Sequence, residues 1–251
     1  MKKTIKNNKN NKMNIILDLD ECCVNCVEIS KYNYDNFNEY KSELKKRGYN
    51  VEKIIIKRKN EEDHYLVFIR PYLQQFINYL FKKYNVSVWS NGDYHYVNEI
   101  CNIIFTKEQK IKLHYILARK YSKKFKFIPT IIVYDTNSKK KLYDLRQKKG
   151  IKDLSYLFKN KPYSNLFNKE NTILIDNLKA HLDFNKTNII HVKDWYFYDY
   201  KDTILIDIMN YFKKNKTKIN PYKLKHFTTQ RKKYLIKISL VIRKQKLQEN
   251  K

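Results

Sequence analysis

Short apolar runs recur along the chain, and several of them end in polar or charged residues. The run Asn14–Leu17 predicts a buried strand at about 13–18, because it is too short and too rich in β-branched residues for a helix. Further runs predict strands at 53–57, 66–71, 86–90, 172–175 and 189–192. Apolar residues at helical spacing predict helices at 72–84, 94–104 and 204–212.

Strands that alternate with helices predict an α/β fold, in which right-handed crossovers build a mostly parallel, Rossmann-like sheet flanked by helices. The chain has only 3 Gly and 4 Pro, which disfavours long linkers, so we expect one main domain at 13–212. A basic arm at 1–12 precedes this domain, and a basic C-terminal tail at 213–251 follows it. Within the domain, the lysine-rich segment 119–149 is predicted to be an insertion.

The chain carries a strong positive charge. It has 53 Lys and Arg residues against 25 Asp and Glu, a formal net charge of +28 in 251 residues. This charge favours polyanionic partners such as nucleic acid, phosphopeptides or anionic lipid surfaces. The composition is also rich in Lys, Asn, Ile and Tyr, whose codons are A+T-rich, so codon usage is an alternative source of the lysines. The sequence leaves both explanations open.

Nothing in the sequence suggests export or a membrane span. No apolar signal-peptide core follows the basic N-terminus, and no run approaches the roughly 20 apolar residues of a membrane helix. We therefore expect an intracellular protein of the cytoplasm or nucleus, not a secreted one. Three of the four cysteines, Cys22, Cys23 and Cys26, share one predicted turn, which fits a reducing compartment better than a disulfide framework. No second Cys/His pair completes a zinc site, so small buried thiols are favoured.

Polar groups follow three of the predicted strands: Asp18 and Asp20, then Ser90, then Asp176 and Asn177. Lys152 lies between the second and third of these positions. Because the carboxyl ends of parallel strands meet at one edge of a sheet, these groups are expected to converge. A pair of carboxylates there suits a divalent cation and a phosphate, with one aspartate attacking phosphorus and the other moving a proton. Taken singly, each residue also has an ordinary explanation as a turn or surface residue.

A series of short motifs, in a fixed order along the chain, resembles those of the aspartate-nucleophile phosphatases of the haloacid dehalogenase superfamily. The chain is most similar to the RNA polymerase II C-terminal-domain (CTD) phosphatase type, the NLI-interacting-factor-like or small CTD phosphatase group. That group has an LDLDETLV-type loop, and residues 17–24 read LDLDECCV. Its other motifs are an arginine-proline pair opening a helix, a hydroxyl after a strand, KDLS, and a strand ending in Asp-Asn, matched here by Arg70-Pro71, Ser90, Lys152–Ser155 and Asp176-Asn177. The resemblance covers about residues 13–212.

The resemblance implies a Mg²⁺-dependent phosphoserine and phosphothreonine phosphatase, with the phosphorylated tail of RNA polymerase II as a candidate substrate. It implies that Asp18 is the nucleophile that forms an aspartyl-phosphate, and that Asp20 is the general acid and base. Ser90 and Lys152 would bind the phosphate. Further implied residues are the metal ligands Asp18, Asp20 (through its main-chain carbonyl) and Asn177, Asp176 beside Lys152 or the metal, and Arg119 on the substrate side.

The sequence departs from the family's pattern at Cys22, and it leaves two other functions open. Cys22 stands where the family has threonine, and because a thiol is a weak hydrogen-bond donor, we expect the loop that aims Asp20 to be held less firmly. One alternative function is an inactive scaffold that binds a phosphorylated or nucleic-acid partner. The presence together of all four expected site residues argues against it: Asp18, Asp20, Lys152 and Asn177. The other is a polynucleotide end phosphatase, which the basic tail would serve.

Overall fold

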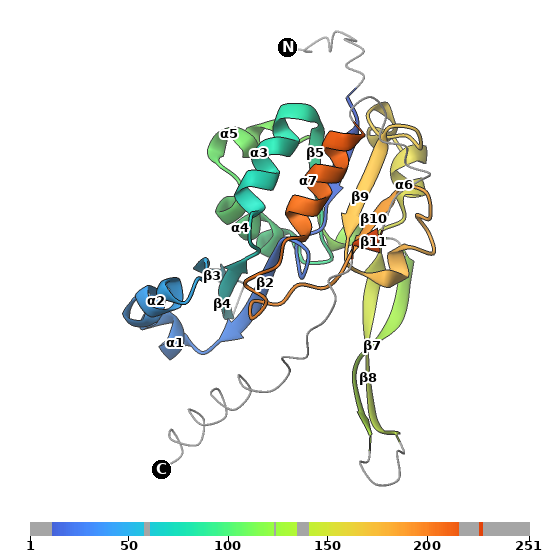
Figure 1. Cartoon of the computed structure of the whole chain (residues 1–251). Coiled ribbons are helices and arrows are strands. Elements are labelled where there is room, and N and C mark those ends of the chain that lie inside the picture. Colours follow the sequence, from blue (N-terminus) through green and yellow to red (C-terminus); the bar gives the residue numbers. More distant parts are fainter. Residues whose placement is uncertain (1–11, 58–60, 123, 135–140, 216–225, 228–251) are drawn as a thin grey trace.

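The computed structural model describes residues 12–57, 61–122, 124–134, 141–215 and 226–227. Its centre is a sheet with the strand order β11-β10-β9-β1-β5-β6, and all neighbouring strands are parallel (Figure 1). The strands are β1 (Asn14–Leu17), β5 (Asn85–Trp89), β6 (Ile116–Leu117), β9 (Thr172–Asp176), β10 (Ile189–Val192) and β11 (His226–Phe227). The predicted α/β fold with a mostly parallel sheet is confirmed.

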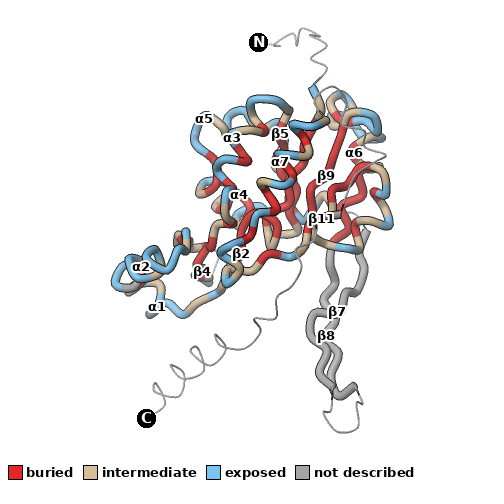
Figure 2. Tube along the Cα trace, in the orientation of Figure 1, coloured by how far each residue is buried: buried red, intermediate tan, exposed pale blue. Residues whose placement is uncertain are grey.

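Helices cover both faces of this sheet (Figure 1). The helices α3 (Leu73–Lys83), α4 (Tyr94–Ile104) and α7 (Ile204–Lys214) pack on one face, and α6 (Leu154–Lys159) packs on the other. In β1, Ile15 and Leu17 join the first core and Ile16 joins the second, and none of the three is exposed to solvent. Figure 2 shows buried residues along the strands at the centre of the molecule, such as β5 and β9. Burial on both faces explains why the central strands appear in the sequence as continuous apolar runs.

A second, antiparallel sheet lies between β1 and α3 in the chain. It has the order β2-β4-β3, formed by β2 (Val24–Ile29), β3 (Val51–Lys57) and β4 (Glu62–Ile69), with α1 (Lys31–Asp35) and α2 (Phe37–Lys46) inserted after β2. The sequence predicted strands near 53–57 and 66–71 but not β2, because we expected all three clustered cysteines in one turn. Cys26 instead lies within β2, whose residues are mostly only partly buried.

The lysine-rich segment 119–149 begins with a short 3₁₀ turn, η1 (Arg119–Tyr121), and continues as a hairpin. Strands β7 (Lys124–Tyr134) and β8 (Lys141–Ile151) pair antiparallel, and the hairpin extends away from the central sheet (Figure 1). Its status as an insertion stays a prediction. The remaining short elements are α5 (Lys107–Lys112), η2 (Tyr163–Asn165) and η3 (Lys179–His181).

The chain beyond 212 contributes to the fold in its described part. Helix α7 continues to Lys214, and β11 pairs with β10 through His191 and Val192. The basic arm, apart from Lys12, and most of the predicted tail lie outside the described residues, so the division into arm, domain and tail stays a prediction. Within the described ranges, no helix is both long and apolar enough to cross a membrane.

Candidate active site

The turn after β1 directs two carboxylates to the carboxyl edge of the sheet. The N–H groups of Cys23 and Val24 both donate to the Leu19 carbonyl, at 2.7 and 3.0 Å, so the chain reverses direction within a few residues. Glu21 has a φ of 53°, in the left-handed region that non-glycine residues rarely adopt. Its N–H donates to the Val24 carbonyl at 2.7 Å. Backbone hydrogen bonds therefore hold the conformation of this turn.

A buried ion pair, Arg70 with Asp202, also holds this turn through a hydrogen bond to its backbone. Arg70 Nη1 donates to the Cys22 carbonyl at 2.8 Å. Its Nε and Nη2 donate to the two carboxylate oxygens of Asp202, at 2.9 and 3.0 Å. The side chains of Arg70 and Asp202 are almost completely buried. The arginine of the arginine-proline motif thus anchors the loop that carries Asp18 and Asp20.

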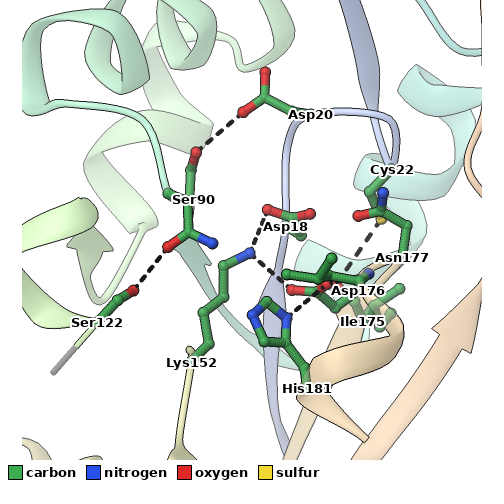
Figure 3. Close-up of polar contacts among 12 residues, drawn as sticks. Asp18, Asp20, Cys22, Ser90, Ser122, Lys152, Ile175, Asp176, Asn177 and His181 are labelled. Atoms are coloured by element: carbon green, nitrogen blue, oxygen red, sulfur yellow. Dashed lines mark hydrogen bonds and ion pairs between the residues drawn. The ribbon is translucent and has the colours of Figure 1, made fainter. Parts of the chain in front are cut away.

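A chain of charged side chains crosses the ends of β1 and β9 (Figure 3). Lys152 Nζ donates to Asp18 Oδ1 and, at 2.7 Å, to Asp176 Oδ2. The other oxygen of Asp176 lies 2.9 Å from His181 Nδ1. Lys152, Asp176 and His181 are at most 1% exposed, and Asp18 is 6% exposed. One ammonium group therefore serves two carboxylates where there is almost no solvent.

The pKa values in this cluster reflect burial and the unequal number of charges. Burial, followed by the negative charge of Asp176, raises the pKa of Asp18 well above its ordinary value, and Lys152 opposes this only in part. Burial would also raise the pKa of Asp176, but His181 and Lys152 outweigh it and hold that pKa below its ordinary value. Burial would lower the pKa of Lys152, but Asp176 and Asp18 overcome this and raise it. Lys152 is therefore a firm cation, and the Asp18 carboxylate would gain from further positive charge.

Asp20 is held by hydroxyl groups instead. Ser90 Oγ donates to Asp20 Oδ2 at 3.2 Å, and the Tyr96 hydroxyl donates to Asp20 Oδ1. Ser90 Oγ also accepts a hydrogen bond from the Gly92 N–H at 2.9 Å. Burial and the Asp20 carboxylate raise the pKa of Tyr96, so this residue remains a neutral donor.

Asn177 follows β9 and completes a set of oxygen donors. Its Nδ2 donates to Asp194 Oδ1 at 3.1 Å, and its amide oxygen points towards Asp18 in Figure 3. Within the described part of the chain, no three Asp, Glu, His or Cys side chains form a cluster that could hold a metal. A cation here would depend on a mixed set: the Asp18 carboxylate, the Asp20 main-chain carbonyl and the Asn177 amide. Mg²⁺ prefers such oxygen ligands, and the excess of carboxylates favours it, so the residues fit this ion.

A model of the NLI interacting factor-like phosphatase family matches residues 13–221 of the chain. The chain belongs to this family. It is 30% identical over 158 residues to putative CTD phosphatase-like protein 355R of Invertebrate iridescent virus 6, covering 61% of this chain and 78% of the relative. It is also 30% identical over 209 residues to the protein of the same name from Invertebrate iridescent virus 3, covering 78% of this chain and 89% of the relative. The resemblance to the CTD-phosphatase type is confirmed.

Two solved structures of the RNA polymerase II CTD phosphatase Fcp1 are also similar to this member of the NLI interacting factor-like family. A variant of fission yeast Fcp1 bound to beryllium fluoride has 17% sequence identity and a TM-score of 0.47, with 79% of this chain and 46% of that chain covered. Fcp1 described as an essential CTD phosphatase has 18% identity and a TM-score of 0.49, with 81% and 48% covered. The present chain thus spans less than half of each Fcp1 chain.

Arg119, the candidate substrate-side arginine, lies next to the loop that carries Ser90. Its N–H donates to the Gly92 carbonyl at 2.9 Å, and its Nε donates to the Asn91 carbonyl at 2.7 Å. Asn91 Nδ2 in turn donates to the Gly150 carbonyl at 2.8 Å, at the base of the β7–β8 hairpin. Because Arg119 is exposed, its guanidinium lies at the rim of the site and not within the buried cluster.

Cys22, at the position of the family's threonine, is completely buried. Its Sγ lies 3.9 Å from the Ile175 carbonyl, a long contact from a weak donor. The turn is supported by Arg70 and by its own backbone hydrogen bonds, and these do not involve the thiol. The structure therefore offers other supports for the loop that we expected Cys22 to weaken.

Sequence reasoning missed three residues of this family member's site: Tyr96, His181 and Asn185. Asn185 Nδ2 donates to the Lys152 carbonyl at 2.7 Å, and its Oδ1 accepts from the Leu154 N–H at 2.9 Å, so it fixes the backbone that presents Lys152. None of the three lies in a motif that the sequence made recognisable. The only signal for Tyr96, one of 22 tyrosines, is its place in the first turn of the helix after Ser90.

Proposed function

We propose that this chain is a Mg²⁺-dependent phosphatase that removes phosphate from serine and threonine side chains of proteins through an aspartyl-phosphate on Asp18. The observation that supports this most is the buried Lys152 ammonium, shared by Asp18 and Asp176 at the ends of adjacent parallel strands. Such a group neutralises charge on a nucleophilic carboxylate and on an incoming phosphate in one place. Asp20, the proposed general acid, follows Asp18 on the same turn, and its carboxylate accepts hydrogen bonds from Ser90 and Tyr96.

The proposed reaction has two steps. First, a carboxylate oxygen of Asp18 attacks phosphorus, and the bond between phosphorus and the serine or threonine oxygen breaks while Asp20 gives that oxygen a proton. The alcohol leaves, and Asp18 carries the phosphoryl group. A water molecule then attacks phosphorus, Asp20 takes a proton from it, and the bond to Asp18 breaks. Inorganic phosphate leaves, and both aspartates return to their starting states.

Other side chains bind and orient the phosphate. Lys152 places its positive charge next to Asp18. The Ser90 hydroxyl, which donates to Asp20, is the group that we propose to donate to a phosphoryl oxygen. Mg²⁺, when bound, would neutralise charge on the phosphoryl group. The Asp18 carboxylate, the Asp20 carbonyl and Asn177 would hold it, while Asp176 holds Lys152 in position.

The phosphorylated tail of RNA polymerase II is the substrate we propose. The two viral relatives are described as CTD phosphatase-like, and a net charge of +28 attracts a polyanionic peptide at a rate that falls with salt. Exposed Arg119 at the rim is the residue we propose to contact the peptide. Two further expectations stay predictions: that the basic C-terminal segment 213–251 of this chain binds nucleic acid, and that the protein is located in the cytoplasm or nucleus.

Turnover of a phosphoserine peptide and of a simple aryl phosphate tests the proposal. We expect Mg²⁺-dependent hydrolysis of both, abolished by EDTA, Asp18→Asn or Asp20→Asn. Asp207→Asn, which neutralises an exposed aspartate on α7, is the matched control and should leave the rate unchanged.

Three outcomes would reject the proposal. Equal rates for wild type and Asp18→Asn would show that the activity does not use this site. Phosphopeptide binding without turnover would identify an inactive scaffold. A strong preference for the terminal phosphate of an oligonucleotide would identify a polynucleotide end phosphatase.

A further inference from the structure

The two oxygens of the Asp20 carboxylate accept hydrogen bonds from two hydroxyl groups, Ser90 on Oδ2 and Tyr96 on Oδ1. A serine hydroxyl has a single proton to donate. Ser90 Oγ also accepts from the Gly92 N–H at 2.9 Å. Its one O–H group can donate a hydrogen bond either to Asp20 or to a phosphoryl oxygen. Ser90 cannot serve both at once.

Tyr96 is fixed in its place more firmly than a surface tyrosine would be. The Asp93 side chain caps α4 by accepting from the Tyr96 N–H at 3.0 Å, which sets the first turn of the helix. A Cβ atom at Gly92 would lie 2.5 Å from Tyr96 Cδ1, so only glycine leaves room for the ring. On another side, the Tyr65 ring of β4 packs edge-on at 5.9 Å between centroids. The partly buried ring of Tyr96 therefore contacts both the turn at Gly92 and strand β4, and its hydroxyl donates to Asp20.

We propose that Tyr96 is a positioning residue that holds Asp20 in place while Ser90 turns from Asp20 to the substrate phosphate. This inference rests on the proposed phosphatase function and deepens it. When the Ser90 hydroxyl donates its hydrogen bond to a phosphoryl oxygen, Asp20 keeps the hydrogen bond from Tyr96 on Oδ1. Its Oδ2 is then free of Ser90 and can carry the proton to the leaving oxygen. Tyr96 itself transfers no proton and need not touch the substrate.

This role predicts a dependence on the leaving group. Protonation by Asp20 matters when the leaving oxygen is strongly basic, and matters little when the leaving group is stable as an anion. Loss of the Tyr96 hydroxyl should therefore slow the cleavage of poor leaving groups selectively. A tyrosine that only supported the fold would lower the rates of all esters together.

The test compares Tyr96→Phe with wild type on phenyl phosphate and on 4-nitrophenyl phosphate, in the presence of Mg²⁺. We expect kcat/KM for phenyl phosphate to fall about tenfold or more, and kcat/KM for 4-nitrophenyl phosphate to fall less than about threefold, since proton donation contributes most to the poorer leaving group. The ratio of the two esters is measured on one preparation, so an inactive fraction of the protein cancels. Tyr94→Phe removes the same hydroxyl from a half-exposed position on the same helix, and should change neither value.

Gly92→Ala provides a second variant that keeps the Tyr96 hydroxyl but forces its ring to move, and it should reproduce the same selective loss. Equal losses on both esters in Tyr96→Phe, or no loss on phenyl phosphate, would overturn the positioning role while leaving the phosphatase function intact. A wild-type chain that hydrolyses neither ester would overturn the proposed function, and the role of Tyr96 with it.

Discussion

The two carboxylates at the end of β1 are held in opposite ways. Asp18 is 6% exposed and pairs with the buried ammonium of Lys152, whereas Asp20 is half-buried and accepts hydrogen bonds from Ser90 and Tyr96. Breaking a buried ion pair costs about 3–5 kcal/mol, whereas a hydrogen bond to a charged group contributes about 1.5–3 kcal/mol. The fixed charge of Lys152 favours the ionised form of the nucleophile, although it offsets the effects of burial and of Asp176 on the Asp18 pKa only in part. Neutral donors suit an acid that must lose and regain a proton.

The largest expected effect comes from removing the shared ammonium with Lys152→Met. Asp18 and Asp176 would then lie buried without the ammonium group that both now contact, so the free energy of unfolding should fall by about 3 kcal/mol or more. Activity should fall about a hundredfold to a thousandfold, as for the loss of other preorganised charges. Urea unfolding and initial rates measure the two effects.

Lys159→Met is the control for Lys152→Met, because Lys159 is an exposed lysine at the end of α6. It should change neither stability nor rate appreciably. If the Lys152→Met protein were as stable as wild type, the ion pair with Lys152 would not stabilise the buried Asp18 carboxylate. The proposed difference between an ion-paired Asp18 and a hydroxyl-bound Asp20 would then be wrong.

The next effect concerns pH and the Asp18 side alone. Burial and Asp176 raise the pKa of Asp18 above its unfolded value of about 3.9. A raised carboxyl pKa contributes stability below the unfolded value, and this contribution is lost as pH rises through the folded value. In EDTA at neutral pH, Asp18→Asn should therefore be more stable than wild type, and near pH 3 the two should be alike.

Urea unfolding across this pH range, repeated with Mg²⁺, completes the test. Mg²⁺ should stabilise wild type more than Asp18→Asn, because binding to the folded state adds stability and the variant lacks one ligand. The pKa shift of Asp176 has the opposite sign to that of Asp18. Because this pKa is lowered in the folded state, Asp176 contributes stability at pH values above its unfolded pKa, and this contribution is lost as pH falls. Asp18→Asn less stable than wild type in EDTA at every pH would contradict the description of Asp18 as a buried carboxylate short of positive charge.

A smaller effect is expected on the Asp20 side. Ser90→Ala removes one of the two donors to Asp20, but Tyr96 continues to hold the other oxygen. We expect the rate to fall about tenfold through the lost contact with phosphate, and the free energy of unfolding to fall by about 1.5 kcal/mol, the low end of the range for a hydrogen bond to a charged group. Ser164→Ala, in η2, is a control on another serine. Destabilisation by Ser90→Ala as large as that by Lys152→Met would remove the difference between the two carboxylates.

The sequence alone predicted the part of the fold in which strands are buried on both faces. Strands β1, β5 and β9 are short, largely apolar runs. A polar residue of the site follows β1 and β5 and ends β9, so the parallel topology brings Asp18, Ser90 and Asp176 to one edge of the sheet. Strand β2 escaped notice because it mixes Asn25 and Glu28 with apolar residues and is only partly covered. Half-covered antiparallel strands leave a weaker pattern than fully buried parallel ones.

The contacts that hold the site were harder to predict than its motifs. Tyr96 reaches Asp20 only because Gly92 leaves room for its ring and Asp93 sets the helix start. His181 reaches Asp176 through a short 3₁₀ turn after β9. Both depend on turn geometry that the residue types of a lysine- and tyrosine-rich chain do not specify.

The smallest expected effect tests what supports the turn beneath both carboxylates. If Arg70 and the backbone hold this turn, Cys22→Thr should change the rate less than about twofold and the free energy of unfolding by less than about 1 kcal/mol, because the contact of the thiol with the Ile175 carbonyl is long, at 3.9 Å. Rates and thermal unfolding of Cys22→Thr and Cys22→Ala, compared side by side, separate the hydroxyl from the volume of the side chain. A large gain in rate with threonine, absent with alanine, would mean that position 22 aims Asp20. The contrast between the two carboxylates would then depend on this residue as well as on Lys152, Ser90 and Tyr96.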